Sequence, residues 1–117
     1  MKSVECSVVQ TGRDDWGDVD RVEIRHDGQP VGEMRVYRYD SGEVYIERID
    51  IDEDKRGQGI CSAVLRQYRG AYIAADSERS ARLYARLGEL VEGPTDEMSY
   101  LDQGYGVYIL TAWDDED

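Results

Sequence analysis

The sequence predicts an α+β, or mixed α/β, fold with a mostly antiparallel central sheet. Three observations support this class. The first half of the chain alternates polar and apolar residues, the middle changes to helical spacing, and a strand-like run follows near the end. The chain has 117 residues, 40% of them apolar, which is enough for one modest core. We therefore expect a single domain over residues 1–117.

The first half of the chain is expected to form one short strand and then a three-stranded antiparallel meander. Residues 4–10 are an apolar-rich run typical of a strand, and the polar residues 12–18 are predicted to be a loop. The Asp and Gly residues between the later runs tolerate the positive φ of a tight reversal. The three runs that alternate with period two are 21–26, 33–38 and 43–51.

A first helix and a short strand follow the meander. Ile60, Val64 and Tyr68 have helical spacing, and Gly70 is positioned to end that helix as a left-handed cap. Residues 72–75 form a short apolar run that is typical of a buried strand.

A second helix and a last strand complete the order of elements. Asp76 or Ser77 is predicted to cap this helix, and Gly88 is predicted to end it. Residues 105–113 are again strand-like. The face that the helix is expected to bury consists of Ser80, Leu83, Tyr84 and Leu87.

The chain is strongly acidic. Its 26 acidic and 14 basic residues give a formal net charge of -12, which disfavours nucleic acids and anionic membranes as partners and favours a cationic one. An alternative cause of the acidity is the salt or base composition of the source. No run approaches the roughly 20 apolar residues that span a bilayer, and residues 1–5 lack the apolar segment of a secretory signal. We expect a cytoplasmic protein.

No metal site is expected. Cys6 and Cys61 are too few for a disulfide scaffold, and neither has another Cys or His at metal-ligand spacing. His26 is the only histidine. Both cysteines are expected to be small buried apolar groups, and the alternative for Cys61, near a helix N-terminus, is a reactive thiol of lowered pKa.

Residues 51–62, a strand end followed by a glycine-bearing loop and the start of a helix, have the features of an anion-binding site. Gly57 and Gly59 can adopt conformations closed to other residues, so that successive backbone N–H groups converge on phosphate oxygens. The helix that follows adds its positive dipole end, and Arg56 adds a cation. The pattern predicts an anion site, with an ordinary strand-to-helix turn as the alternative. It completes neither a nucleotide-hydrolysing phosphate loop nor a dinucleotide fingerprint.

This segment resembles the acetyl-CoA signature of the GNAT superfamily of N-acetyltransferases. The family pattern is Arg/Gln-x-x-Gly-x-Gly/Ala, preceded by an aliphatic residue that ends the fourth strand. Ile51, Arg56 and Gly59 occupy places of that pattern, and Cys61 stands where the family usually has Gly or Ala.

Residues 77–88 resemble a second signature of the same family, Asn-x-x-Ala/Ser-x-x-Leu-Tyr-x-x-Leu-Gly-Phe. Its tail, Leu-Tyr-x-x-Leu-Gly, is intact, whereas Ser77 replaces the usual Asn and Glu89 the usual Phe. The interval between the two signatures is shorter than in the family, which implies a truncated first helix and a short fifth strand. Residues 12–20 are too few for the helix pair that normally shapes the acceptor site, so this pocket would be open or completed by another chain, as in a homodimer.

The resemblance implies a compact GNAT-like fold with a β-α-β-α CoA-binding core, and direct attack of an amine on acetyl-CoA. Glu47 and Asp50 are the implied general-base candidates, Tyr84 the implied donor to the leaving thiolate, and a backbone N–H of 49–51 the implied oxyanion donor. The alternatives are solvated strand residues for the two acids and a packing role for Tyr84. The implied cofactor-binding residues are Ile49, Ile51, Arg56, Gly57, Gln58, Gly59, Ile60, Cys61, Ser62, Ser77, Ser80 and Tyr84.

Three functional hypotheses follow. The first is an N-acetyltransferase that acts on a primary amine of a cationic small molecule, such as a polyamine or an amino sugar, or of a basic protein. The second is a CoA-binding module without turnover. The third is an acidic interaction or inhibitor protein, which only the net charge of -12 supports.

Overall fold

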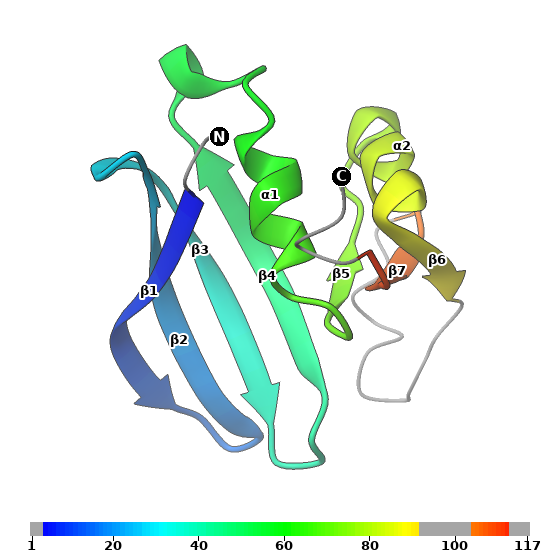
Figure 1. The fold of residues 1–117 in the computed structure, drawn as a ribbon. Helices are drawn as coiled ribbons and strands as arrows, with labels where there is room; N and C mark the ends of the chain where they lie inside the picture. The colour runs from blue at the N-terminus through cyan, green and yellow to red at the C-terminus, as the bar shows by residue number, and fades with distance from the viewer. Residues whose placement is uncertain (1–3, 92–103, 113–117) are drawn as a thin grey trace. The chain divides into compact units, whose positions relative to one another are not determined.

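The computed structural model describes residues 4–91 and 104–112, and it divides into two compact units, one up to Val64 and one from Leu65 onward. The predicted order of strands, helix, strand, helix and strands is confirmed, and so is the mixed α/β class with mostly antiparallel pairing. The single domain over 1–117 stays a prediction. The elements are β1 (Val4–Arg13), β2 (Gly17–His26), β3 (Gln29–Tyr39), β4 (Val44–Ile51), the 3-10 helix η1 (Glu53–Lys55), α1 (Ile60–Arg66), β5 (Tyr72–Ala74), α2 (Glu78–Leu87), β6 (Gly88–Val91) and β7 (Val107–Leu110) (Figure 1).

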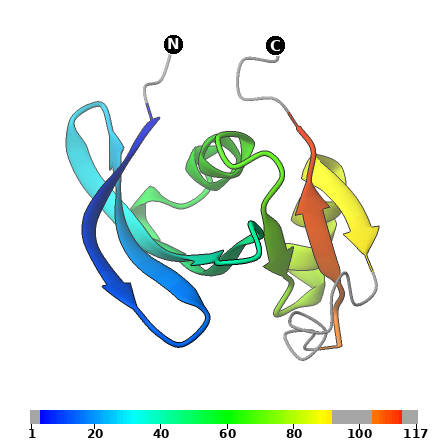
Figure 2. The same cartoon turned by 90° about the horizontal axis from the view of Figure 1, so that it is seen from below.

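In the first unit, β1 to β4 form an antiparallel meander in chain order. Figure 2 shows that this sheet curves around the start of α1. The side chains that face inward from β2 alternate with exposed ones, as period-two patterning requires. The buried apolar side chains of this unit are Val22, Ile24, Val31, Met34, Val36, Tyr45, Ile46, Ile51, Ile60 and Val64.

Each ladder of the meander contains one register shift, where one strand has an extra residue. In the third ladder the extra residue is Glu47, because Val36 pairs with Ile46 whereas Arg35 pairs with Arg48. Without the extra residue, Ile46 and Arg48 would share a face of the sheet. With it, Ile46 is buried and Arg48 is exposed on the opposite face.

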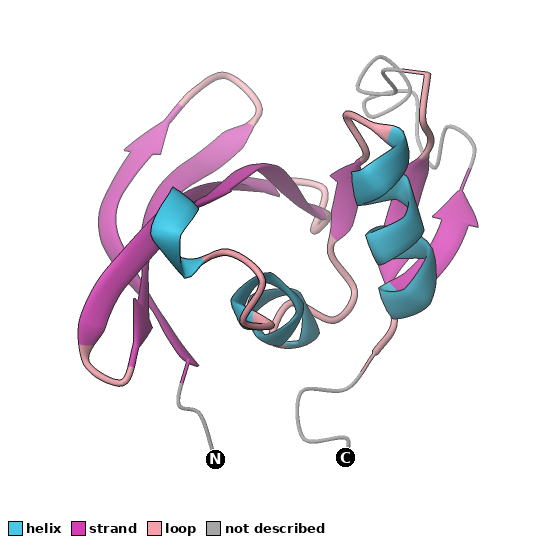
Figure 3. Cartoon of the chain, turned by 90° about the horizontal axis from the view of Figure 1, so that it is seen from above, coloured by secondary structure: helices cyan, strands magenta, loops and turns pink. Residues whose placement is uncertain are grey.

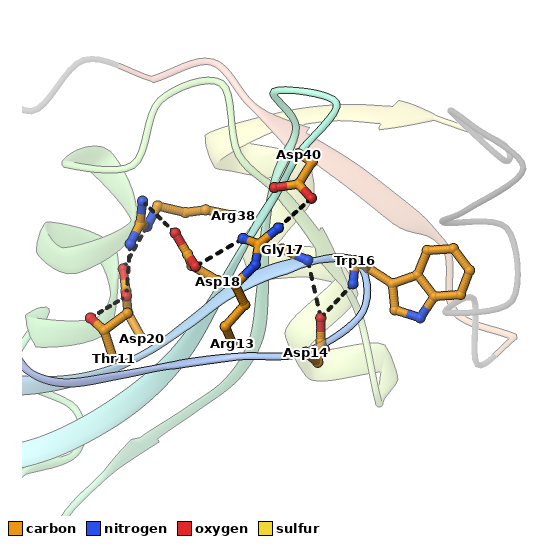
Figure 4. A network of polar contacts seen from close by, with 9 residues as sticks. All are labelled: Thr11, Arg13, Asp14, Trp16, Gly17, Asp18, Asp20, Arg38 and Asp40. Atoms are coloured by element: carbon orange, nitrogen blue, oxygen red, sulfur yellow. Dashed lines mark hydrogen bonds and ion pairs between the residues drawn. The ribbon is translucent and has the colours of Figure 1, made fainter.

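The predicted loop over 12–18 is wrong. β1 continues to Arg13 and β2 begins at Gly17, so only residues 14–16 connect them. The carboxylate of Asp14 makes this tight connection possible, because its Oδ1 accepts hydrogen bonds from the N–H groups of Trp16 (2.8 Å) and Gly17 (3.1 Å) (Figure 4). The segment therefore extends the sheet and forms no helix pair.

A polar network joins this hairpin to the end of β3 (Figure 4). Arg38 donates from Nε to Asp20 Oδ2 (2.8 Å) and from a terminal nitrogen to Asp20 Oδ1 (3.0 Å), and the Thr11 hydroxyl donates to the same carboxylate (2.8 Å). Arg13 pairs with the carboxylates of residues 18 and 40 at the rim. Asp20 is only 4% exposed, and within the described residues it is the only buried charged group.

In the second unit, β7 pairs antiparallel with both β5 and β6. α2 lies against these strands and contacts β6 and β7 (Figure 3). Gly88 ends α2, as predicted, and continues directly into β6 with an extended backbone. A Cβ at this position would collide with the carbonyl of Ile109, so the junction requires glycine.

The predicted end of the first helix is wrong, and part of the predicted last strand lies outside the described residues. α1 ends at Arg66, so Tyr68 lies in a turn rather than in the helix, with its N–H bonded to the carbonyl of Leu65 (3.1 Å). Gly70 has a left-handed backbone, with φ of 93°, but it ends this turn. The last strand is β7, and Trp113 of the predicted run 105–113 lies outside the described residues.

Both segments that were expected to be shortened are short. α1 has seven residues and β5 has three.

No helix among the described residues is long and apolar enough to cross a membrane.

Candidate functional site

The glycine-bearing loop is anchored at the end of β4. The N–H of Asp52 donates to the carbonyl of Val31 (2.7 Å), and the carbonyl of Asp52 accepts from the N–H of Lys55 (2.8 Å) to start η1. Nε of Arg56 donates to the carbonyl of Ile51 (2.9 Å). This bond engages one of the five N–H donors of the guanidinium. The arginine is therefore held at the strand end, at the entrance to the loop.

Gly57 and Gly59 both have a left-handed backbone, with φ of 83° and 78°. A Cβ at either position would have no heavy atom within 4 Å, so the space beside the loop is open. The first hydrogen bond of α1 runs from the N–H of Ala63 to the carbonyl of Gly59 (3.1 Å). The N–H groups of residues 60–62 therefore precede the helical pattern of bonds. Backbone donors, an arginine and open space together fit a pyrophosphate.

Cys61 is an ordinary thiol. Burial raises the pKa of its side chain to about 11, and the same cause raises the pKa of Cys6 to about 11. Both residues are therefore protonated at neutral pH. Both side chains are only partly buried, so the expectation of buried apolar groups is met in part. The alternative of a reactive Cys61 with a lowered pKa is wrong.

The second signature begins at a capped helix. Ser77 Oγ accepts from the N–H of Ser80 (3.1 Å), while Ser80 Oγ accepts from the N–H groups of Ser77 (3.1 Å) and Asp76 (3.0 Å). This reciprocal arrangement is a capping box, so the predicted cap at Ser77 is confirmed. A cofactor contact by either hydroxyl would have to add to these bonds or displace one of them.

Tyr84 is packed inside the second unit. It is 6% exposed, and its ring meets the ring of Tyr108 edge-on, with centroids 6.1 Å apart. Leu87, one turn further along α2, is also buried. The packing role that the sequence offered as an alternative for Tyr84 is therefore observed.

The two base candidates lie on the exposed side of β4. Glu47 Oε1 accepts from Arg35 (3.1 Å), and its other oxygen lies 3.5 Å from the hydroxyl of Tyr37. Asp50 accepts from Nε of Arg48 at 2.7 Å. Each candidate base is thus paired with an arginine of the same sheet. Sequence reasoning missed both arginines. Arg35 lies on β3, and strand register, which periodicity does not reveal, decides that it meets Glu47. Arg48 is two residues before Asp50 on the same strand, so period-two alternation alone places the two on one face.

The structure places the predicted site residues in two groups. The first unit holds Glu47, Ile49, Asp50 and Ile51 on β4 and, after it, Arg56, Gly57, Gln58, Gly59, Ile60, Cys61 and Ser62. The second unit holds Ser77, Ser80 and Tyr84 at the start and on the buried face of α2. No group of three or more potential metal ligands occurs among the described residues.

Comparison with protein families gives one match. The model of the acetyltransferase (GNAT) domain matches residues 21–88. This segment runs from within β2 to the residue that ends α2, and it contains both signature regions. No curated protein matches the chain.

Two solved structures are similar to the chain at low identity. A proposed streptothricin acetyltransferase from Bacillus anthracis str. Ames, in complex with acetyl coenzyme A, is 14% identical, with a TM-score of 0.49 over 78% of this chain and 59% of that one. Arabidopsis thaliana Naa50, in complex with the bisubstrate analogue CoA-Ac-MVNAL, is 16% identical, with a TM-score of 0.42 over 77% of this chain and 70% of that one. The chain thus spans less than two thirds of the first structure. Because the family match covers more than half of the 117 residues, the chain belongs to the GNAT acetyltransferase family.

Proposed function

We propose that this chain is an N-acetyltransferase that binds acetyl-CoA and transfers its acetyl group to a primary amine. The observation that supports this most is the geometry of the loop over 56–62, which lies inside the matched family segment. Arg56 and the backbone N–H groups that follow it would hold the pyrophosphate. Acetyl-CoA supplies an acetyl group activated as a thioester.

The acceptor loses two protons in the reaction and the sulfur gains one. The ammonium first loses one proton to become a nucleophile. The amine nitrogen then forms a bond to the acetyl carbon and loses a second proton, while the carbon–sulfur bond breaks and the sulfur gains a proton. An alkylamine with a pKa of about 10.4 is mostly ammonium at neutral pH, so a base is needed. In this proposal Glu47 or Asp50 accepts the amine proton, and Tyr84 donates to the sulfur.

The strand that carries the base candidates supports the assignment of Glu47. Glu47 is the extra residue of the β3–β4 ladder, and such bulges re-aim side chains and are common beside active sites. Asp50 directly precedes Ile51, the residue whose carbonyl holds Arg56. A backbone N–H among residues 49–51 would stabilise the negative charge that develops on the acetyl oxygen.

The net charge of -12 supports a cationic acceptor. Polyamines, amino sugars and the amines of basic proteins all fit this class. Electrostatic attraction of this kind increases the association rate at low salt and decreases as salt is added.

A CoA-binding module without turnover is the second candidate. The burial of Tyr84 against Tyr108 favours it, because a proton donor must reach the sulfur. The two candidates differ only in catalysis, so an activity measurement separates them.

The test follows CoA thiol release with a chromogenic thiol reagent, with spermidine, glucosamine and a lysine-rich peptide as acceptors. Release above the rate without protein is expected for at least one amine. Glu47→Gln should lower kcat by roughly 100-fold or more, as loss of a general base does. Glu89→Gln, an exposed site on β6, is the matched control. Bound acetyl-CoA with no release for any amine would leave only the binding module.

A further inference from the structure

The β1–β4 sheet has one face turned away from the start of α1 (Figure 2), and the register of its strands arranges the charged residues of that face in rows. Arg21 on β2 lies directly opposite Arg35 on β3, which lies opposite Arg48 on β4. Like charges in directly opposite positions destabilise a sheet. The neighbouring row on the same face repeats this arrangement with acids, and its members are Glu23, Glu33 and Asp50.

Ion pairs within the face join most of these charged side chains, and the two exceptions are one arginine and one glutamate. The pairs are Arg48 with Asp50 (2.7 Å), Arg35 with Glu47 (3.1 Å) and Arg25 with Glu23 (2.8 Å). Within residues 4–91 and 104–112, no hydrogen bond or ion pair joins the exposed side chains of Arg21 and Glu33 to another group. The face therefore presents an unpaired cation on β2 and an unpaired anion on the adjacent strand β3, where Glu33 lies opposite the residue two positions after Arg21.

These unpaired groups line a hollow of about 510 Å³. Its volume is within the range of small-molecule sites, roughly 300–1,000 Å³. The lining has three arginines and two acids, so it is positive overall in a chain whose net charge is -12. A second hollow of about 440 Å³ shares Arg21, Glu33 and Asp50 with the first. The lining residues of the larger hollow are Gln10, Gly12, Val19, Arg21, Glu33, Met34, Arg35, Arg48 and Asp50.

We propose that this hollow binds a zwitterionic small molecule, one that carries a carboxylate or phosphate and an ammonium group. Arg21, supported by Arg35 and Arg48, binds the anionic end, since guanidinium groups pair with such oxygens in two-point contacts. Glu33 and Asp50 bind the ammonium. Adjacent rows on one face are two residues apart along a strand, or about 7 Å, which sets the separation of the two ends.

The chemistry of the face favours this occupant over a second copy of the chain. Each copy would bring a net charge of -12, and that repulsion opposes association. In the proposed function this ligand is the amine acceptor, and only that identification rests on the proposed function. The acceptor then carries an anionic group, which global charge alone does not indicate.

The test is a titration of the isotopically labelled protein with 6-aminohexanoate, followed by NMR and without acetyl-CoA. Its extended chain separates the ammonium from the carboxylate by about the spacing of the two rows. Hexylamine and hexanoate are the matched probes with one charge each, and 3-aminopropyl phosphate distinguishes a phosphate from a carboxylate preference. We expect shifts at the amides of β2, β3 and β4, and binding by a zwitterion at least tenfold tighter than by either single-charge probe.

Variants locate the site. Arg21→Ala should weaken zwitterion binding at least tenfold and leave hexylamine binding unchanged. It should leave the fold intact, because no hydrogen bond or ion pair joins this side chain to another described group. Arg82→Ala, exposed on α2, is the control and should change nothing. The proposal would be overturned if hexylamine or hexanoate bound as tightly as the zwitterions, or if no probe bound at all. It would also be overturned if Arg21→Ala bound the zwitterions as tightly as the wild type. A doubling of mass that Arg21→Ala abolishes would also overturn it, in favour of a second copy.

These outcomes are independent of acetyl transfer. If zwitterions bind as predicted but no acetyl-CoA binds, the hollow stands and the proposed function fails. If acetyl-CoA binds and amines are acetylated but Arg21→Ala has no effect on zwitterion binding, the proposed function stands and the hollow fails.

Discussion

At the scale of single residues, Asp20 shows how an acidic chain accommodates a buried charge. Its carboxylate accepts two hydrogen bonds from Arg38 and one from Thr11. The hydrogen bonds from Arg38 are the largest cause that lowers the pKa of Asp20 below its ordinary value, and burial opposes them. The folded state therefore prefers the ionised form, and the protein is more stable when Asp20 is ionised.

This preference predicts a pH dependence of stability. Because the pKa of Asp20 is lower in the folded than in the unfolded state, its contribution is complete above the unfolded value of about 3.9 and is lost as pH falls through the folded value. Asp20→Asn should lower the free energy of unfolding by roughly 1–3 kcal/mol at pH 7. Urea unfolding at pH 7 and pH 3 measures both effects.

The control for this prediction is the exposed pair of Arg13 and Asp40, which are 56% and 61% exposed as side chains. Solvent screens such a pair, so Asp40→Asn should lower the free energy of unfolding much less than Asp20→Asn. Equal losses for Asp20→Asn and Asp40→Asn would contradict the assigned role of the buried carboxylate.

The cysteines give a second prediction at this scale. With a pKa raised to about 11, Cys61 and Cys6 should react slowly with a disulfide reagent at pH 8, and quickly after unfolding in urea. The rate should rise as pH approaches 11. Fast reaction of one thiol in the folded protein at pH 7 would show a stabilised thiolate and would contradict the assignment.

At the scale of elements, the capping box of α2 is a local device with a measurable contribution. Ser77→Ala removes the oxygen that accepts from the N–H of Ser80 and should lower the free energy of unfolding by about 1 kcal/mol. Ser77→Asn should retain stability, because Asn is an equally good cap. Thermal or urea unfolding followed by circular dichroism measures the difference. A neutral Ser77→Ala would mean that α2 is held by packing alone.

Some features of the helices and strands could be predicted from the sequence, and others could not. The capping of α2 by Ser77 was predictable, because a cap depends on adjacent residues. The end of α2 at Gly88 was predicted too, but the crowding that requires glycine there comes from the carbonyl of Ile109 on β7, which local sequence does not reveal. The continuation of β1 to Arg13 was not, because Asp14 closes the hairpin within three residues and local polarity had indicated a longer loop. The bulge at Glu47 was equally inaccessible, since it exists only relative to β3.

At the scale of the whole molecule, composition and local structure lead to different expectations for the ligand. The net charge of -12 predicts attraction of cations over a distance. Register, however, gathers Arg21, Arg35 and Arg48 into one hollow, which is positive locally. The loop over 56–62 could be proposed as an anion site from the sequence because its residues are contiguous, whereas the hollow combines four strands and requires their pairing.

The residues of the predicted site are divided between the two units. The first unit provides the anion loop and both base candidates, and the second provides the capped helix with Tyr84. The proposed function depends on the first unit above all, because the loop over 56–62 would hold the cofactor. A binding measurement on the intact chain tests it without requiring knowledge of the acceptor.

That measurement is a calorimetric titration with acetyl-CoA of the wild type, Arg56→Glu and Arg82→Glu. The last two variants have the same change in charge, and Arg82 lies exposed on α2, outside the loop. Circular dichroism confirms that each variant is folded. The account predicts micromolar binding by the wild type and Arg82→Glu, and at least tenfold weaker binding by Arg56→Glu, equivalent to about 1.4 kcal/mol or more. Absence of binding by the wild type, or equal binding by all three proteins, would contradict it.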